Sequence, residues 1–202
     1  FMFTDKFFFL FMTAIVRNTF FIFVSNNYKT ITLTHINDDH FVSYTASYVI
    51  VLTTAFQIVG GLIIDKYGVM WVTISIYALN IAYIALTGFF PSSKFVFVIA
   101  IGIFRLQTGI NATLNISIIY QMYHQLLAAK LLKYFTINSI VAIFIGNVVY
   151  NLFGFGESQT GMWIFYTIMN LAGIVYVLYY MRKDMDEVPD HHSESMLTDS
   201  AY

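Results

Sequence analysis

Six long apolar segments dominate the sequence and restrict what the chain can fold into. Each comes close to the ~20 mostly apolar residues that a helix needs to cross a membrane. Short polar or helix-breaking stretches, such as 65–68 and 91–94, separate them. We therefore expect an all-α integral membrane protein with six transmembrane helices. The predicted spans cover about residues 7–25, 41–64, 71–90, 95–120, 135–154 and 162–181.

The composition fits a protein whose surface faces lipid. Hydrophobic residues make up 58% of the chain and charged residues 10%, against roughly 45–50% and about 25% in soluble domains. Mean hydropathy is +0.71. The formal net charge of −1 argues against a nucleic-acid partner. The absence of cysteine excludes disulfides and thiolate metal sites.

The basic residues predict an orientation. Six of them fall at one side of the predicted bundle and two, Lys29 and Lys94, at the other. The positive-inside rule then places both termini in the cytoplasm. We divide the chain into a six-helix bundle, 1–183, and an acidic cytoplasmic tail, 184–202, which we expect to be disordered. The six basic residues are Lys6, Lys66, Lys130, Lys133, Arg182 and Lys183.

Two arginines, Arg17 and Arg105, fall inside predicted spans, where a charge is costly and usually faces a cavity or a partner. No carboxylate lies well inside any span. One interpretation is that they provide positive potential along the pathway of an anion. The other is that they bond backbone carbonyls or pair with helices outside this chain.

Polar residues also recur on one helix face. Gln107, Asn111 and Asn115 follow one another every four residues in the fourth span. Such a stripe either lines an aqueous cavity or forms hydrogen bonds between helices, and the sequence leaves both open. Three asparagines mark the fifth span: Asn138, Asn147 and Asn151.

Catalytic signatures are missing from the sequence. There is no nucleophile elbow, no His-Glu-x-x-His and no phosphate-binding glycine loop. His35 and His40 flank Asp38 and Asp39. This group suggests a metal, but we interpret it as a solvated loop. His191 and His192 are interpreted as part of a solvated tail. We expect no enzyme activity, no metal and no cofactor.

The stretch from Gly61 to Gly68 (GLIIDKYG) resembles the major facilitator superfamily signature, Gly-x-x-x-Asp-Arg/Lys-x-Gly, in the loop after the second helix of each six-helix half. The glycines permit close packing and a tight reversal, and Asp65 can cap or pair at the facing helix end. The resemblance implies a gating motif of Gly61, Asp65, Lys66 and Gly68 that helps to lock two halves together on the cytoplasmic side. The chain departs from the pattern at 69–71, where Val, Met and Trp replace basic residues.

Two further resemblances bear on which half this is. The stretch 105–109 (RLQTG) resembles the Arg-x-x-x-Gly motif in the fourth helix of the first half. The stretches 26–29 and 38–41 resemble the opening of the second half in oxalate:formate antiporter-like and monocarboxylate transporter-like members. With the acidic tail, they favour the second, C-terminal half. We expect a fragment of a longer protein, partnered by a missing N-terminal half or a second subunit.

The resemblance implies a carrier that moves a small solute, such as an organic anion, by alternating access, as a symporter or antiporter. Oxalate:formate relatives carry a basic residue where this chain has Gln57, and a lysine in the fifth helix that is missing here. An alternative is a non-transporting structural subunit of a larger membrane complex. The candidate substrate-binding residues are Arg17, Gln57, Arg105, Asn111 and Asn115.

Overall fold

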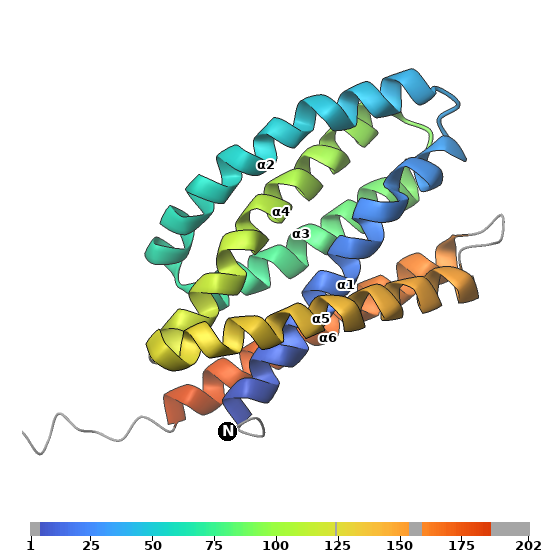
Figure 1. The fold of residues 1–202 in the computed structure, drawn as a ribbon. Helices are drawn as coiled ribbons and strands as arrows, with labels where there is room; N and C mark the ends of the chain where they lie inside the picture. The colour runs from blue at the N-terminus through green and yellow to red at the C-terminus, as the bar shows by residue number, and fades with distance from the viewer. Residues whose placement is uncertain (1–4, 124, 154–158, 187–202) are drawn as a thin grey trace, which may run out of the picture.

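The computed structural model describes residues 5–123, 125–153 and 159–186, and within these ranges every long element is a helix (Figure 1). All six helices are long and apolar enough to cross a membrane. The predicted fold class is therefore confirmed, and the protein is an all-α, multi-pass membrane protein. The helices are α1 (Asp5–Leu33), α2 (Asp39–Tyr67), α3 (Val69–Phe89), α4 (Lys94–Met122), α5 (Gln125–Phe153) and α6 (Thr160–Asp186).

Two predicted helix boundaries were wrong. The first predicted span ended at residue 25, but α1 continues to Leu33 because Ile31 is buried in the core. The fifth predicted span began at residue 135, but α5 begins at Gln125 and buries Ala128 and Leu131. The tail was predicted to begin at residue 184, but α6 continues to Asp186. The rest of the predicted tail, 187–202, lies outside the described residues.

The connections follow from capping and backbone geometry. The side chain of Asp38 accepts a hydrogen bond from the backbone N–H of Phe41 at 3.0 Å and caps α2. Ser93 caps α4 in the same way, accepting from Val96 N–H at 3.3 Å. Gly68 joins α2 to α3 at φ +79°, where a side chain is strained.

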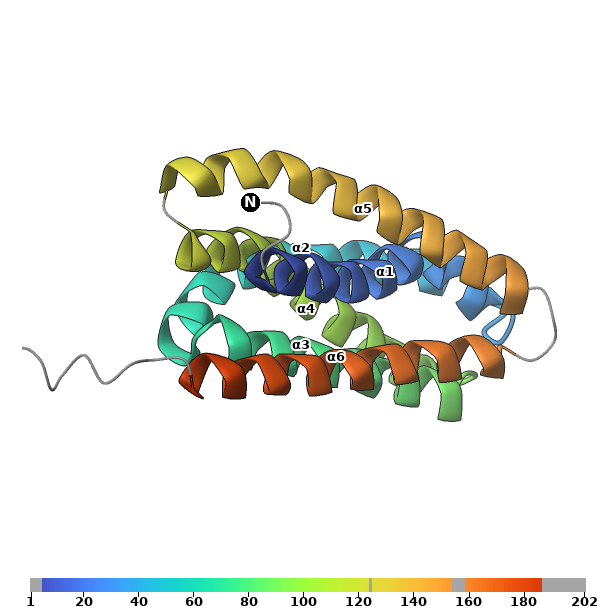
Figure 2. The same ribbon diagram turned by 90° about the horizontal axis from the view of Figure 1, so that it is seen from below.

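The helices pack as two related triplets, α1–α3 and α4–α6. The two most extensive contacts are α2 with α4 and α1 with α5, and α3 packs along α6 (Figures 1 and 2). Exchanging α1, α2 and α3 for α4, α5 and α6 converts the contact of α2 with α4 into that of α1 with α5 and maps the contact of α3 with α6 onto itself. The match is partial, because α3 also packs closely on α4, and the equivalent contact of α1 with α6 is weaker. With three spans in each triplet, the second enters the membrane from the side opposite to the first. The start of α1 and the end of α6 lie at the same end of the bundle (Figure 1).

Equivalent positions in the triplets carry the same residue types. Gly60 and Gly146 each lie 21 residues after the first residue of their helices. Gly60 approaches the fourth helix and Gly146 the first, so that a Cβ on either would contact a neighbouring helix. Arg17 and Arg105 occupy nearly the same position along α1 and α4.

The core has two layers along the bundle. One, near the chain ends, contains Phe9 and Tyr77. The other is largely aromatic, with Tyr166 packed 5.5 Å from Phe20 and 4.8 Å from Phe23 between ring centroids. Arg17, described next, lies on α1 between Ala14 of the first layer and Phe20 of the second.

Candidate functional site

Arg17 is the central feature of the bundle. It lies in the middle of α1 with only 1% of its surface exposed. Its Nε donates a 2.6 Å hydrogen bond to Asn111 Oδ1 on α4, and its Nη2 donates a hydrogen bond to Asn115 Oδ1, one turn further. Its Nη1 is buried and has no partner. The predicted polar face of the fourth span therefore meets the predicted buried arginine.

Two further hydrogen bonds lie close to Arg17. Asn111 Nδ2 donates to Asn18 Oδ1 at 3.3 Å, which fixes the orientation of the amide that faces Arg17. Tyr77 on α3 donates its hydroxyl proton to the Thr13 carbonyl of α1 at 2.9 Å. Its ring lies against Gly173, where an added Cβ would be 2.8 Å from Tyr77 Cζ. Both hydrogen-bond partners of Arg17 therefore lie on α4, while Tyr77 ties α3 to α1 one turn before Arg17.

The charge of Arg17 is not neutralised by any acid in the described part of the chain. Within the described ranges no carboxylate lies within 4.0 Å of the Arg17 guanidinium. The ion pairs seen in those ranges join Lys29 to Asp39 and Lys94 to Asp38. Amide oxygens alone offset the cost of burying the cation. Gln107, one turn before Asn111, is also buried, and its Oε1 has no partner. The site is thus a buried positive centre with unused hydrogen-bonding capacity.

The other predicted binding residues lie apart from this centre. The Gln57 side chain is exposed on α2, and only its backbone carbonyl is engaged, accepting a 2.8 Å bond from Thr113 Oγ1. Arg105 precedes Asn111 by six residues, roughly 9 Å of helix rise. Its Nε is buried without a partner, and its guanidinium lies 5.8 Å from the centroid of the Phe104 ring. Of the five predicted binding residues, the structure therefore brings only Arg17, Asn111 and Asn115 into contact.

The residues of the predicted gating motif fall at the turn between α2 and α3. Gly68 supplies the positive φ, as expected for a tight reversal. Gly61 does not provide the close packing that we predicted, since an added Cβ there meets nothing nearer than 3.9 Å. Its neighbour Gly60 does, at 3.1 Å from the Cα of Ile110. Asp65 and Lys66 are exposed.

The opposite end of the bundle is tied by ion pairs. Lys94 Nζ lies 2.5 Å from Asp38 Oδ2, and Lys29 Nζ lies 2.7 Å from Asp39 Oδ1. The hydrogen bond from Lys94, with that from Phe41 N–H, lowers the pKa of Asp38 below its usual value. Both carboxylates are engaged, so the acidic pair that suggested a metal acts as a bridge between helices.

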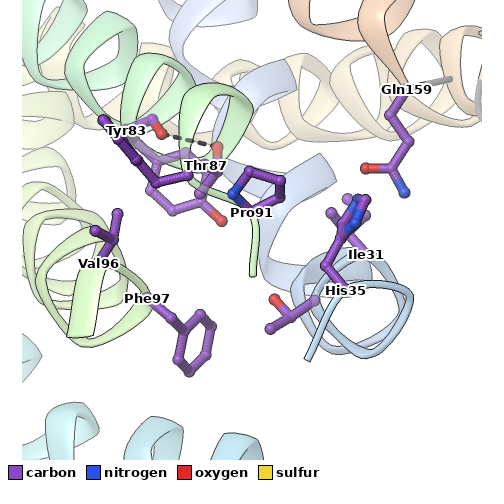
Figure 3. Close-up of a pocket in the computed structure, with 10 residues that line it drawn as sticks. Ile31, His35, Tyr83, Thr87, Pro91, Val96, Phe97 and Gln159 are labelled. Atoms are coloured by element: carbon purple, nitrogen blue, oxygen red, sulfur yellow. Dashed lines mark hydrogen bonds between the residues drawn. The ribbon is translucent and has the colours of Figure 1, made fainter. Parts of the chain in front are cut away.

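A small cavity lies beside this end. Its volume is about 20 Å³, enough for a water molecule but not for a solute. Figure 3 shows it between Tyr83, Thr87 and Pro91 on one side and Ile31 and His35 on the other. His35 is exposed at its edge. This cavity is too small to be the binding site of a carrier.

Buried asparagines that the sequence did not single out join α3 to α6. Asn80 Nδ2 donates to Asn170 Oδ1 at 2.7 Å, and Asn170 Nδ2 donates to the Tyr166 carbonyl at 2.7 Å. In the fifth span, Asn138 donates to the Phe11 carbonyl at 3.1 Å, whereas Asn147 and Asn151 are exposed. The buried members hold helices together. The four-residue stripe and the asparagines of the fifth span stood out in the sequence, whereas Asn80 and Asn170 belong to no polar pattern.

No protein family model, curated protein or solved structure matches this sequence.

Proposed function

We propose that the chain is half of a secondary carrier that moves a small organic anion, such as a monocarboxylate, across a membrane by alternating access. The observation that carries this proposal is Arg17, a buried cation held by amide oxygens, with one unpartnered nitrogen and no acid beside it in the described ranges. Charges inside membrane spans usually mark pathways or partners. A carboxylate would supply the charge that the amides lack.

The arrangement of the helices in two triplets also supports the carrier proposal. Transporter folds are often built from inverted repeats, with the site near the midplane where the repeats meet. Arg17 and its asparagine partners join α1 to α4, the first helices of the two triplets, near the middle of both. This is the place where a carrier of this design would bind its solute.

We further propose that the end carrying the termini is cytoplasmic. Lys66, Lys130 and Arg182 are exposed at that end. At the other end, Lys29 and Lys94 are each neutralised by an aspartate. The positive-inside rule counts basic residues rather than net charge, and six of them at this end against two at the other support the assignment.

A structural subunit is the second candidate, and the surface of α2 favours it. Large apolar side chains line this helix at high exposure: Tyr48 75%, Ile58 72% and Val51 69%. Either lipid or a partner bundle covers them. In a scaffold, Arg17 would only tie α1 to α4.

Transport assays distinguish the two candidates. The chain, alone and with any partner that co-purifies, is reconstituted in proteoliposomes, and uptake of labelled formate and acetate is measured under an imposed pH gradient. The carrier proposal predicts saturable uptake that Arg17→Gln abolishes and that Gln57→Ala, a change in an exposed side chain, retains. Absence of uptake in every preparation, with a stable complex recovered, would favour the scaffold.

A further inference from the structure

An apolar groove runs along the outer surface of the bundle between α2 and α3. Its volume is about 390 Å³, and its walls include Ile63, Tyr67, Trp71, Ile76, Leu79 and Ile110. From Trp71 to Leu79 it follows α3 for roughly 12 Å. The Ser75 hydroxyl on its wall donates its proton to the Trp71 carbonyl at 2.9 Å, so that proton is not available to a ligand. The groove therefore suits a hydrocarbon.

A cation lies at one end of this groove. Lys66 Nζ is 5.2 Å from the ring centroid of Tyr67, which is itself part of the wall. Lys66 is exposed, and no carboxylate lies within 4.0 Å of it in the parts of the chain that are described, although the exposed Asp65 is its neighbour in sequence. Tyr67 and Trp71 are 58% and 57% exposed. A lysine with a tyrosine and a tryptophan at the end of a span is typical of the headgroup level of a membrane.

The size of the groove selects among possible occupants. Over the same 12 Å a helix about 10 Å across occupies roughly 900 Å³, so only one of its faces could enter a groove of about 390 Å³. A single acyl chain is narrow enough to enter. We infer that the groove binds one acyl chain of an anionic phospholipid whose phosphate lies on Lys66. This site is independent of the transport proposal and of Arg17.

Competition between an anionic and a zwitterionic lipid tests whether the charge of Lys66 binds the lipid phosphate. The purified 202-residue chain is mixed with equal amounts of phosphatidylglycerol and phosphatidylcholine of identical acyl chains, and the bound lipids are counted by native mass spectrometry. Phosphatidylglycerol should dominate, and Lys66→Gln should reduce the preference about fivefold, the value of one lysine near an anionic lipid. Lys130→Gln, which removes an exposed charge at the same end, should leave it unchanged. Equal effects of the two substitutions would overturn the inference, because the preference would then reflect general surface charge.

Filling the groove with a larger side chain tests whether the acyl chain binds there. Ser75→Phe places a ring in the groove and should remove the adduct with either lipid. Ser47→Phe is the matched control, because Ser47 is an exposed serine on α2 whose hydroxyl is likewise bonded to the carbonyl four residues before it. Adducts that survive in Ser75→Phe at the level of the control would show that the lipid binds elsewhere.

Discussion

Asn111 holds the buried charge of Arg17, and replacing it with leucine tests how much that contact stabilises the bundle. The substitution removes the acceptor of the 2.6 Å bond from Arg17 Nε and the donor of the 3.3 Å bond to Asn18 Oδ1. It leaves a guanidinium that is 1% exposed with a single acceptor, Asn115. The chemistry of the site therefore changes while the apolar packing around it is kept.

Two estimates bound the effect. Hydrogen bonds between side chains in membrane proteins average about 0.6 kcal/mol and reach about 1.7, because the unfolded chain in the bilayer also finds partners. An unsatisfied buried group costs about 1–3 kcal/mol, and more when it is charged. Since a buried cation is left with a single acceptor, we expect Asn111→Leu to lower the free energy of unfolding by about 2 kcal/mol. Asn115→Leu should cost about half as much, because Asn115 is only partly buried.

A double-mutant cycle assigns this loss to the charge. Arg17→Met removes the buried cation and leaves the Oδ1 atoms of Asn111 and Asn115 without a donor. A buried acceptor that loses its partner costs about 1–3 kcal/mol, so we expect a loss of stability in that range. In that background Asn111→Leu should cost no more than about 0.6 kcal/mol. Reversible unfolding in bicelles provides the measurement, and an equal cost of Asn111→Leu in both backgrounds would refute the reasoning.

Three further predictions concern packing, pH and the buried asparagines. Gly109→Ala should lower the free energy of unfolding by about 3 kcal/mol, because the added Cβ would lie 2.4 Å from the Thr53 carbonyl oxygen. Gly61→Ala is the control and should be tolerated, because its Cβ would meet nothing nearer than 3.9 Å. Unfolding curves of the two variants check this. The lowered pKa of Asp38 means that its ion pair stabilises the fold above the ordinary carboxyl pKa of about 4 and is lost as pH falls through the lower, folded value. Asp38→Asn should therefore flatten the acid limb of melting temperature against pH, with no change in shape above pH 5. Asn170→Leu should lower stability by up to about 1.7 kcal/mol, because the Asn80 amide loses its acceptor, and Asn147→Leu, at an exposed position, should be neutral in the same assay.

Hydropathy and breakers were enough to predict the number of helices and their class. A run of apolar residues has no alternative in hydrocarbon but to form a helix. Helix ends were less predictable, because polar residues such as Asn26 can continue a helix once a neighbour such as Ile31 is buried. That burial depends on tertiary contacts that the sequence pattern does not contain.

The candidate site could be predicted only in part, because contacts between helices are not visible in the sequence. A charge in an apolar run, Arg17, and a four-residue polar period, Asn111 to Asn115, are visible in one dimension. The hydrogen bonds that join Arg17 on α1 to the two asparagines on α4 cannot be read from the sequence. Tyr77 reaches Thr13 only because Gly173 leaves room for its ring, and no local pattern encodes that contact.

Anion-dependent stability is the most direct test of the central claim that Arg17 is an anion site. Unfolding free energy is measured against acetate concentration at constant ionic strength. Ligand binding to the native state should raise it by about 1.4 kcal/mol at ten times the dissociation constant. We predict this rise for the native chain and a flat response for Arg17→Met. The same rise in both proteins, or none in either, would contradict the claim.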